Sequence, residues 1–177
     1  MVYFLVYTGA RIGEVRGFSR KGFLSREGMI KITQSAPEKG DIGLVKSADG
    51  VRDIPLHPVL GEVLEKWLAS HSRRLVFGTN NDRPISNSNL YSRMLEPLKD
   101  RADALASKGS DPRFVRVSRD RAFHAFRHHY ASRLVQKDAN LKQLQYLMGH
   151  ASAAITLDIY AHLFENDQKA LVHSLVI

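Results

Sequence analysis

Apolar residues recur every three or four positions along several stretches of the chain, as they do on the buried face of an amphipathic helix. The clearest stretch follows Pro58, because proline suits the first turn of a helix. Its apolar positions are Leu60, Val63, Leu64, Trp67 and Leu68. The same spacing predicts a helix over 87–107, bent at Pro97, and another over 122–137.

The N-terminal stretch MVYFLVYTGA (1–10) is apolar and indicates a segment of the core. Thr8 is suited to cap a helix over 9–17, because its hydroxyl can accept a hydrogen bond from the free N–H groups of a first turn. Arg11 and Glu14 lie three positions apart and therefore share one face of this predicted helix.

Strand-like patterns separate these helices. Residues 28–33 (GMIKIT) alternate between apolar and polar positions. Residues 42–56 (IGLVKSADGVRDIPL) predict two strands joined at Asp49-Gly50, a dipeptide favoured in tight hairpin turns, and Lys46 then lies near the hairpin tip. The pattern as a whole predicts an α+β fold, mainly α-helical with a small antiparallel β-sheet.

Towards the C-terminus, LKQLQYLM (141–148) predicts a short helix that ends at Gly149. The segment MGHASAAITLDIYAHLF (148–164) has two interpretations. In the structural one, a second helix fills the core with apolar side chains while Tyr160 lies at its edge. Those apolar side chains are Ile155, Ile159 and Leu163. In the functional one, the spacing brings His150 and Tyr160 to one site.

Length and composition narrow the class of protein. At 177 residues, with 44% hydrophobic and 25% charged residues, the chain fits one globular domain. It has no cysteine, which excludes disulfides and cysteine-ligated metals and fits a reducing compartment. The apolar N-terminal stretch lacks the basic flank of a signal peptide and is too short to span a bilayer. We therefore expect a cytoplasmic protein with no membrane partner.

The charge is strongly basic and unevenly distributed. The net charge is +8 and the pI is about 9.9. Residues 113–137 hold seven Arg or Lys and a single acid, Asp120. A local basic surface is typical of contacts with a phosphate backbone, the alternative being an ordinary solvated face. The candidate DNA-binding residues are Arg113, Arg116, Arg119 and Arg121.

The string HAFRHHYAS (124–132) places histidine and arginine side chains on one face of a predicted helix. His124 and Arg127 lie three positions apart, so both side chains can meet one ligand. His124 and His128 have the spacing of a zinc pair, but the glutamate of an HExxH motif and any cysteine are missing. We therefore expect no metal site.

Three segments in chain order, TGARIGEVRGF (8–18), HAFRHHYAS (124–132) and MGHASAAITLDIYAH (148–162), resemble the tyrosine recombinase, or phage integrase, family. Its members carry a T-G-x-R-x-x-E segment, a hairpin lysine, an H-x-x-R segment, an L-G-H segment and a nucleophilic tyrosine. The resemblance implies the catalytic-domain fold of DNA breaking and rejoining enzymes. It also implies a catalytic set of Arg11, Lys46, His124, Arg127, His150 and Tyr160, supported by Glu14.

The chemistry of these residue types agrees with the resemblance. A free tyrosine has a pKa of about 10 and is only ~0.1% phenolate at pH 7, so a nucleophilic Tyr160 needs cations or histidines nearby. Arg11 and Arg127 can hold the non-bridging oxygens of a phosphodiester without a metal or other cofactor. Rejoining by a DNA hydroxyl then needs no ATP. The resemblance implies that Lys46 protonates the departing 5′ oxygen. Lys39 is the second candidate, because the hairpin is one residue longer than in many relatives.

The resemblance implies site-specific recombination of double-stranded DNA through a 3′-phosphotyrosyl intermediate, in a bacterial, prophage or mobile-element protein. Members also have a core-binding domain and a helical segment before T-G-x-R. We therefore expect residues 1–177 to be an integrase-type catalytic domain that lacks both. Residues 166–177 (NDQKALVHSLVI) predict a terminal helix that the resemblance implies can dock onto a neighbouring protomer on DNA.

Two alternatives stay open. A DNA-binding or regulatory remnant would keep the fold and the basic surface without cutting DNA. A type IB topoisomerase would share the chemistry, although the L-G-H segment with TLDIY favours a recombinase. A covalent protein–DNA adduct separates the enzyme from the remnant.

Overall fold

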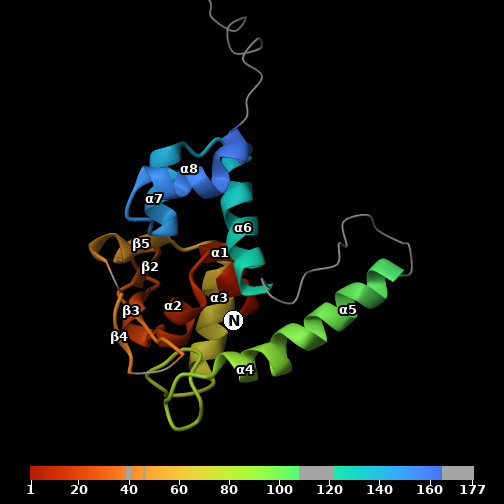
Figure 1. Cartoon of the computed structure of the whole chain (residues 1–177). Coiled ribbons are helices and arrows are strands. Elements are labelled where there is room, and N and C mark those ends of the chain that lie inside the picture. Colours follow the sequence, from red (N-terminus) through yellow and green to blue (C-terminus); the bar gives the residue numbers. More distant parts are fainter. Residues whose placement is uncertain (39–40, 46, 108–121, 165–177) are drawn as a thin grey trace, which may run out of the picture.

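The structure is a computed structural model that describes residues 1–38, 41–45, 47–107 and 122–164 (Figure 1). The helices are α1 (Val2–Thr8), α2 (Ile12–Gly17), α3 (Pro58–Ala69), α4 (Asn87–Leu90), α5 (Glu96–Ser107), α6 (Ala122–Val135), α7 (Leu141–Met148) and α8 (Ala153–Tyr160). The strands are β1 (Phe23–Leu24), β2 (Met29–Ile32), β3 (Gln34–Ser35), β4 (Gly43–Leu44) and β5 (Arg52–Pro55). Shorter helical turns are η1 (Arg20–Gly22), η2 (Ala48–Gly50), η3 (Tyr91–Leu95) and η5 (Ala161–Phe164). The predicted class, mainly α-helical with a small antiparallel sheet, is confirmed.

The main sheet has the strand order β1-β2-β5, with both pairs antiparallel. Alternation predicts a strand over 28–33, and β2 confirms it: Ile30 and Ile32 are buried while Lys31 between them is exposed. Ile30 lies opposite Ile54 of β5, so the two side chains close one face of the sheet over the core.

The predicted hairpin over 42–56 is wrong. In the described part of the chain, β4 pairs with β3 and β5 pairs with β2, and Asp49-Gly50 lies in the turn η2. The Asp-Gly signal is local, whereas pairing is decided by burial. Strand β5 has an apolar residue to bury against β2, while both residues of β4 are exposed.

The start of the chain is a core helix, as its apolar composition predicts, but the predicted cap at Thr8 is wrong. Thr8 is the last residue of α1, and its hydroxyl donates to the carbonyl of Phe4 at 2.6 Å. Gly9 then ends the helix in the left-handed region, with φ 59°. A new helix, α2, begins after Arg11, whose backbone N–H donates to the Glu14 carboxylate at 2.8 Å. The free N–H at this start is thus satisfied by an acid within the helix.

Two other helical predictions are confirmed. Helix α3 begins at Pro58 and buries Leu60 and Leu64. The stretch predicted over 87–107 is helical with a π-helical turn at η3, which ends two residues before Pro97. Proline lacks an N–H and crowds the carbonyl four residues earlier, which lies within this turn.

The core has two buried clusters. The larger one packs α1, α2, α3 and the sheet around Phe4. The centroid of the Phe4 ring lies 4.6 Å from that of Phe18 and 5.3 Å from that of Phe77. The smaller one joins α6, α7 and α8 through Ala131, Leu144, Met148 and Tyr160. Helix α6 also packs along α1 (Figure 1), so the two clusters meet where α1 ends.

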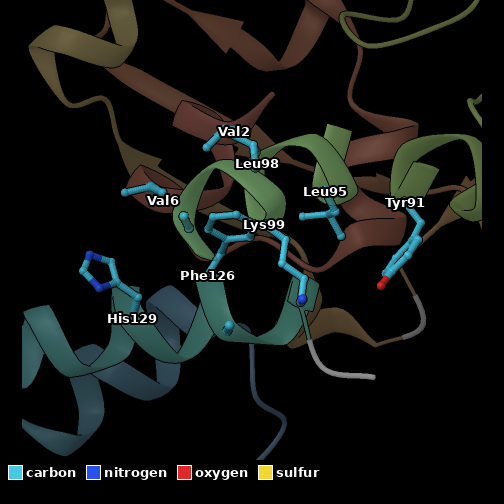
Figure 2. A pocket seen from close by; sticks show the side chains of 10 residues that line it. Val2, Val6, Tyr91, Leu95, Leu98, Lys99, Phe126 and His129 are labelled. Atoms are coloured by element: carbon cyan, nitrogen blue, oxygen red, sulfur yellow. The ribbon is translucent and has the colours of Figure 1, made fainter. Parts of the chain in front are cut away.

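Helix α5 extends away from the body of the molecule in Figure 1. An apolar pocket of about 420 Å³ lies between α1, α5 and α6. Figure 2 shows Val2, Val6, Leu95, Leu98 and Phe126 around it, with His129 at one side. None of the described helices is both long and apolar enough to cross a membrane.

Candidate active site

Arg127 on α6 links the ends of two other helices. Its buried guanidinium donates to the carbonyl of Gly9, after α1, at 2.7 Å, and to the carbonyl of Met148, the last residue of α7. It also lies 3.0 Å from Nε2 of His150. Burial lowers the pKa of Arg127 to about 10, so the side chain stays cationic at neutral pH.

His150 is fixed between Arg127 and α8. It follows Gly149, whose left-handed backbone (φ 61°) ends α7, as predicted. Its Nδ1 lies 2.9 Å from the hydroxyl of Thr156 on α8. A guanidinium can only donate, so Nε2 is the acceptor and Nδ1 carries the proton that is donated to Thr156. Burial, and then the nearby arginines, lower the pKa of His150 to about 4, so the ring is neutral.

Arg11 lies half-exposed beside this group. Its guanidinium donates to Glu14 at 3.1 Å and to the carbonyl of Gly149 at 3.0 Å. Arg11, His124, Arg127 and His150 line one pocket of about 430 Å³, which we call the arginine pocket. Four of the six predicted catalytic side chains therefore come together, from segments more than 100 residues apart in the chain.

Tyr160 lies beside the arginine pocket but is buried, with 2% of its surface exposed. Its ring stacks on His150, with centroids 6.2 Å apart, and meets His128 edge-on at 5.3 Å. Burial raises the pKa of Tyr160, and the charges of Arg127 and Arg11 act in the opposite direction. The phenol is therefore protonated in this conformation.

The purely structural interpretation of α8 is wrong in its orientation. Ile155 and Ile159, predicted to fill the core, are 41% and 39% exposed and line the arginine pocket. Thr156 and Tyr160 take the inner face instead. The hydrogen bond from His150 to Thr156 and the fit of the Tyr160 ring into the smaller cluster fix this face.

Arg52 is the residue that sequence reasoning missed. Its side chain is 0% exposed and its guanidinium donates to both oxygens of Glu14, at 3.1 and 2.8 Å. Burial raises the pKa of the Glu14 carboxyl. The hydrogen bonds and the positive charges of Arg52 and Arg11 lower it by more, so the net shift of this pKa is downward. The signal was the strand period of two, because Arg52 shares the inward face of β5 with Ile54.

Residues 1–167 match the family model described as the phage integrase family. The chain belongs to the phage integrase family. It is 24% identical over 171 residues to a transposase of transposon Tn916 from Enterococcus faecalis, covering 91% of this chain and 41% of that protein. It is 25% identical over 174 residues to the tyrosine recombinase XerD of Lacticaseibacillus casei, covering 97% and 53%. The chain thus spans about half the length of these curated relatives.

Solved structures show the same fold. The Tn1549 transposon integrase in complex with circular intermediate DNA superposes with a TM-score of 0.78 at 23% identity, over 99% of this chain and 58% of that one. XerH site-specific recombinase bound to its difH substrate gives a TM-score of 0.67 at 21% identity, over 98% and 44%. The predicted tyrosine recombinase catalytic-domain fold is confirmed.

Several predicted residues lie outside the described part of this phage integrase family member. They are Lys46, its alternative Lys39, the arginines Arg113, Arg116, Arg119 and Arg121, and the predicted helix over 166–177. Val45 and Ser47, which flank Lys46 in sequence, line a second pocket of about 460 Å³ that shares Arg11 and His150 with the arginine pocket. Among the described residues, no cluster of three or more His, Cys, Asp or Glu could hold a metal ion.

Proposed function

We propose that this protein breaks and rejoins double-stranded DNA in site-specific recombination, with Tyr160 as nucleophile. The observation that carries the proposal is the arginine pocket, where two guanidiniums and two histidines converge beside a tyrosine. Two arginines match the oxygens of a phosphodiester and stabilise the charge that develops on them during attack. Membership of the phage integrase family supports the same reaction.

The reaction is a balanced exchange of one ester for another. The Tyr160 oxygen gives up its proton to His124 or to solvent and attacks the phosphorus, while the bond from phosphorus to the 5′ oxygen breaks and that oxygen takes up a proton. Lys46 supplies that proton in our proposal. The 3′-phosphotyrosine keeps the energy of the original ester, so a DNA 5′ hydroxyl can reverse the step on another strand without ATP.

Two features give roles to the remaining side chains. Arg11 and Arg127 hold the non-bridging oxygens, and His124, exposed at the rim of the pocket, contacts the phosphate or passes a proton. His150 is neutral, so it contributes as a hydrogen-bonding group that helps to hold Arg127. Tyr160 is buried and its side chain interacts with Arg127, so in our proposal the bound phosphate meets the phenol oxygen at the Arg127 side of the pocket.

The partners and setting are part of the same proposal. The solved neighbours include an integrase in complex with circular intermediate DNA and a recombinase bound to its substrate, and the net charge of +8 suits a polyanion. We propose that residues 1–177 act as the catalytic domain, that copies associate on DNA through 166–177, and that the setting is the bacterial cytoplasm. The relatives named as transposases and as the ICEBs1 integrase support a mobile-element origin.

The test is covalent capture on nicked duplexes with randomised sequence at the nick, read on a denaturing gel. We expect the wild-type protein to form an adduct whose DNA can be sequenced to give the site. Tyr160→Phe should form none while keeping its fold and its non-covalent binding, because only the phenol oxygen is lost. EDTA should leave the adduct unchanged, since the arginines take the place of a metal.

Two results would contradict the proposal. Binding of DNA without an adduct would support the alternative of a DNA-binding or regulatory remnant. An adduct that persists in Tyr160→Phe would remove Tyr160 from the mechanism.

A further inference from the structure

The Arg52 side chain links helix α2 to helix α7 beside the arginine pocket, which it does not line itself. On one side, its NH1 and NH2 donate to the two oxygens of Glu14 at 3.1 and 2.8 Å. On the other, its Nε donates to the carbonyl of Leu147 in α7 at 2.9 Å. A further bond to the carbonyl of Gly50, at 3.1 Å, fixes the guanidinium to the chain just before β5. The side chain is fully buried.

Glu14 in turn holds Arg11 in two ways. The Oε1 atom that accepts from Arg52 also accepts from NH1 of Arg11, at 3.1 Å. The Oε2 atom that accepts from Arg52 also accepts from the backbone N–H of Arg11, at 2.8 Å. A half-exposed arginine otherwise samples many rotamers, so this carboxylate removes most of its freedom.

The turn between α7 and α8 holds Arg11 as well. NH2 of Arg11 donates to the carbonyl of Gly149 at 3.0 Å. Arg52 packs against the same glycine, because a Cβ built there would lie 2.7 Å from its NH1 atom. Both anchors of the Arg11 guanidinium, Glu14 and Gly149, are therefore in direct contact with Arg52.

We propose that Arg52 is a positioning residue that fixes the Arg11 guanidinium at the arginine pocket through Glu14. A buried ion pair adds little net stability compared with apolar packing, so its contribution here is the geometry that it imposes. The planar fork of arginine meets both carboxylate oxygens at once, which a lysine cannot do. The inference rests on the proposed function, because a fixed Arg11 speeds catalysis only if it meets a phosphate.

The first readout is independent of activity. Guanidinium N–H groups give separate NMR signals only when the side chain is held, and Arg11→Lys assigns those of Arg11. Arg52→Lys keeps the buried charge and the fold but cannot form the two-pronged bond, and Arg52→Gln removes the charge. A denaturant titration first shows whether each variant is folded. In each folded variant, we expect the Arg11 signals to disappear.

Arg16→Gln is the matched control. Arg16 is also a buried arginine, lies in the same helix as Glu14, donates to the carbonyl of Ile85 at 2.6 Å and pairs with Glu38 at 2.9 Å. It does not line the arginine pocket. The Arg11 signals should survive this change even if stability falls. Their survival in Arg52→Lys would overturn the proposal.

The second readout is the single-turnover rate of adduct formation at saturating DNA. A group displaced by about 1 Å can slow a reaction by roughly 100-fold, so we expect Arg52→Lys to slow adduct formation by that order. In an Arg11→Ala background the same change should have almost no further effect. Equal factors in both backgrounds would show that Arg52 does not act through Arg11. If the wild type forms no adduct while the Arg11 signals still depend on Arg52, the proposed function fails and the positioning role stands.

Discussion

At the scale of single residues, the neutral state of His150 makes stability depend on pH. Burial, and after it the charges of Arg127, Arg11 and Arg52, lower the pKa of the ring from 6.5 to about 4 in the folded protein. In the unfolded chain the ring takes up a proton near pH 6.5, whereas the folded protein resists it until about pH 4. The contribution of neutral His150 to the stability of the folded protein is therefore fully present above pH 6.5 and is lost as the pH falls towards 4.

We expect this single group to lower the free energy of unfolding by about 2 kcal/mol over that window, after allowance for solvent screening. Urea titrations at several pH values measure it. His150→Gln is the control, because the amide can still bond Arg127 and Thr156 but does not titrate. If wild type and variant lose stability in parallel between pH 6.5 and 4, the neutral assignment of His150 is wrong.

At the scale of elements, the turn from α7 to α8 depends on Gly149. Its φ of 61° strains any side chain, and a Cβ would lie 2.7 Å from Arg52. Gly28 offers a matched control, because its φ of 65° carries the same strain while its Cβ position is open. We expect Gly28→Ala to cost roughly 1 kcal/mol of stability and Gly149→Ala about 3 kcal/mol, since the second also displaces a buried group.

Thermal or urea unfolding measures both variants. The excess destabilisation in Gly149→Ala should come with the same disappearance of Arg11 NMR signals as in the Arg52 variants, because the Arg52 guanidinium has to move. Equal destabilisation by the two alanines would mean that the contact between Gly149 and Arg52 is relaxed without consequence.

The elements that sequence could predict are those whose signals are local. Helical spacing and end residues are enough for α3 and α7, because the apolar face and an end signal, Pro58 or Gly149, lie within one short stretch. The pairing of β5 with β2 could not be predicted from Asp49-Gly50, because the partner strand lies some twenty residues away and is selected by the burial of Ile54. Local turn chemistry and long-range burial were in conflict, and burial decided the pairing.

The same distinction applies to the site. Motif order across the chain was enough to bring Arg11, His124, Arg127 and His150 together. It could not find Arg52, whose role depends on a carboxylate 38 residues earlier in the chain. Nor could helical spacing alone decide which face of α8 is buried, because that face is selected by the hydroxyl of Thr156 bonding to His150.

At the scale of the whole molecule, the chain brings residues from the α1–α2 turn, α2, α6, the α7–α8 turn and α8 to one pocket on a basic protein. The proposed action of this arginine pocket on DNA requires that the DNA backbone be held along a wider surface. The arginines between 113 and 121, which directly precede α6 in sequence, are the candidates for that role. Binding through phosphates releases counterions, so its strength depends on salt rather than on base sequence.

We therefore expect DNA affinity to fall steeply as salt rises, by roughly 10³-fold or more between 50 and 200 mM if six or more phosphates are bound. Fluorescence anisotropy with a labelled duplex measures the slope of log affinity against log salt.

Replacing Arg113, Arg116, Arg119 and Arg121 by glutamine should make that slope shallower by almost one unit for each phosphate that is no longer neutralised, roughly 0.9 for duplex DNA. Replacing the same number of exposed lysines and arginines that do not line the pocket, such as Lys21, Arg26, Lys31 and Lys66, removes equal charge and should change the slope less. A flat response to salt, or equal slopes in the two quadruple variants, would show that residues 113–121 do not bind the DNA backbone.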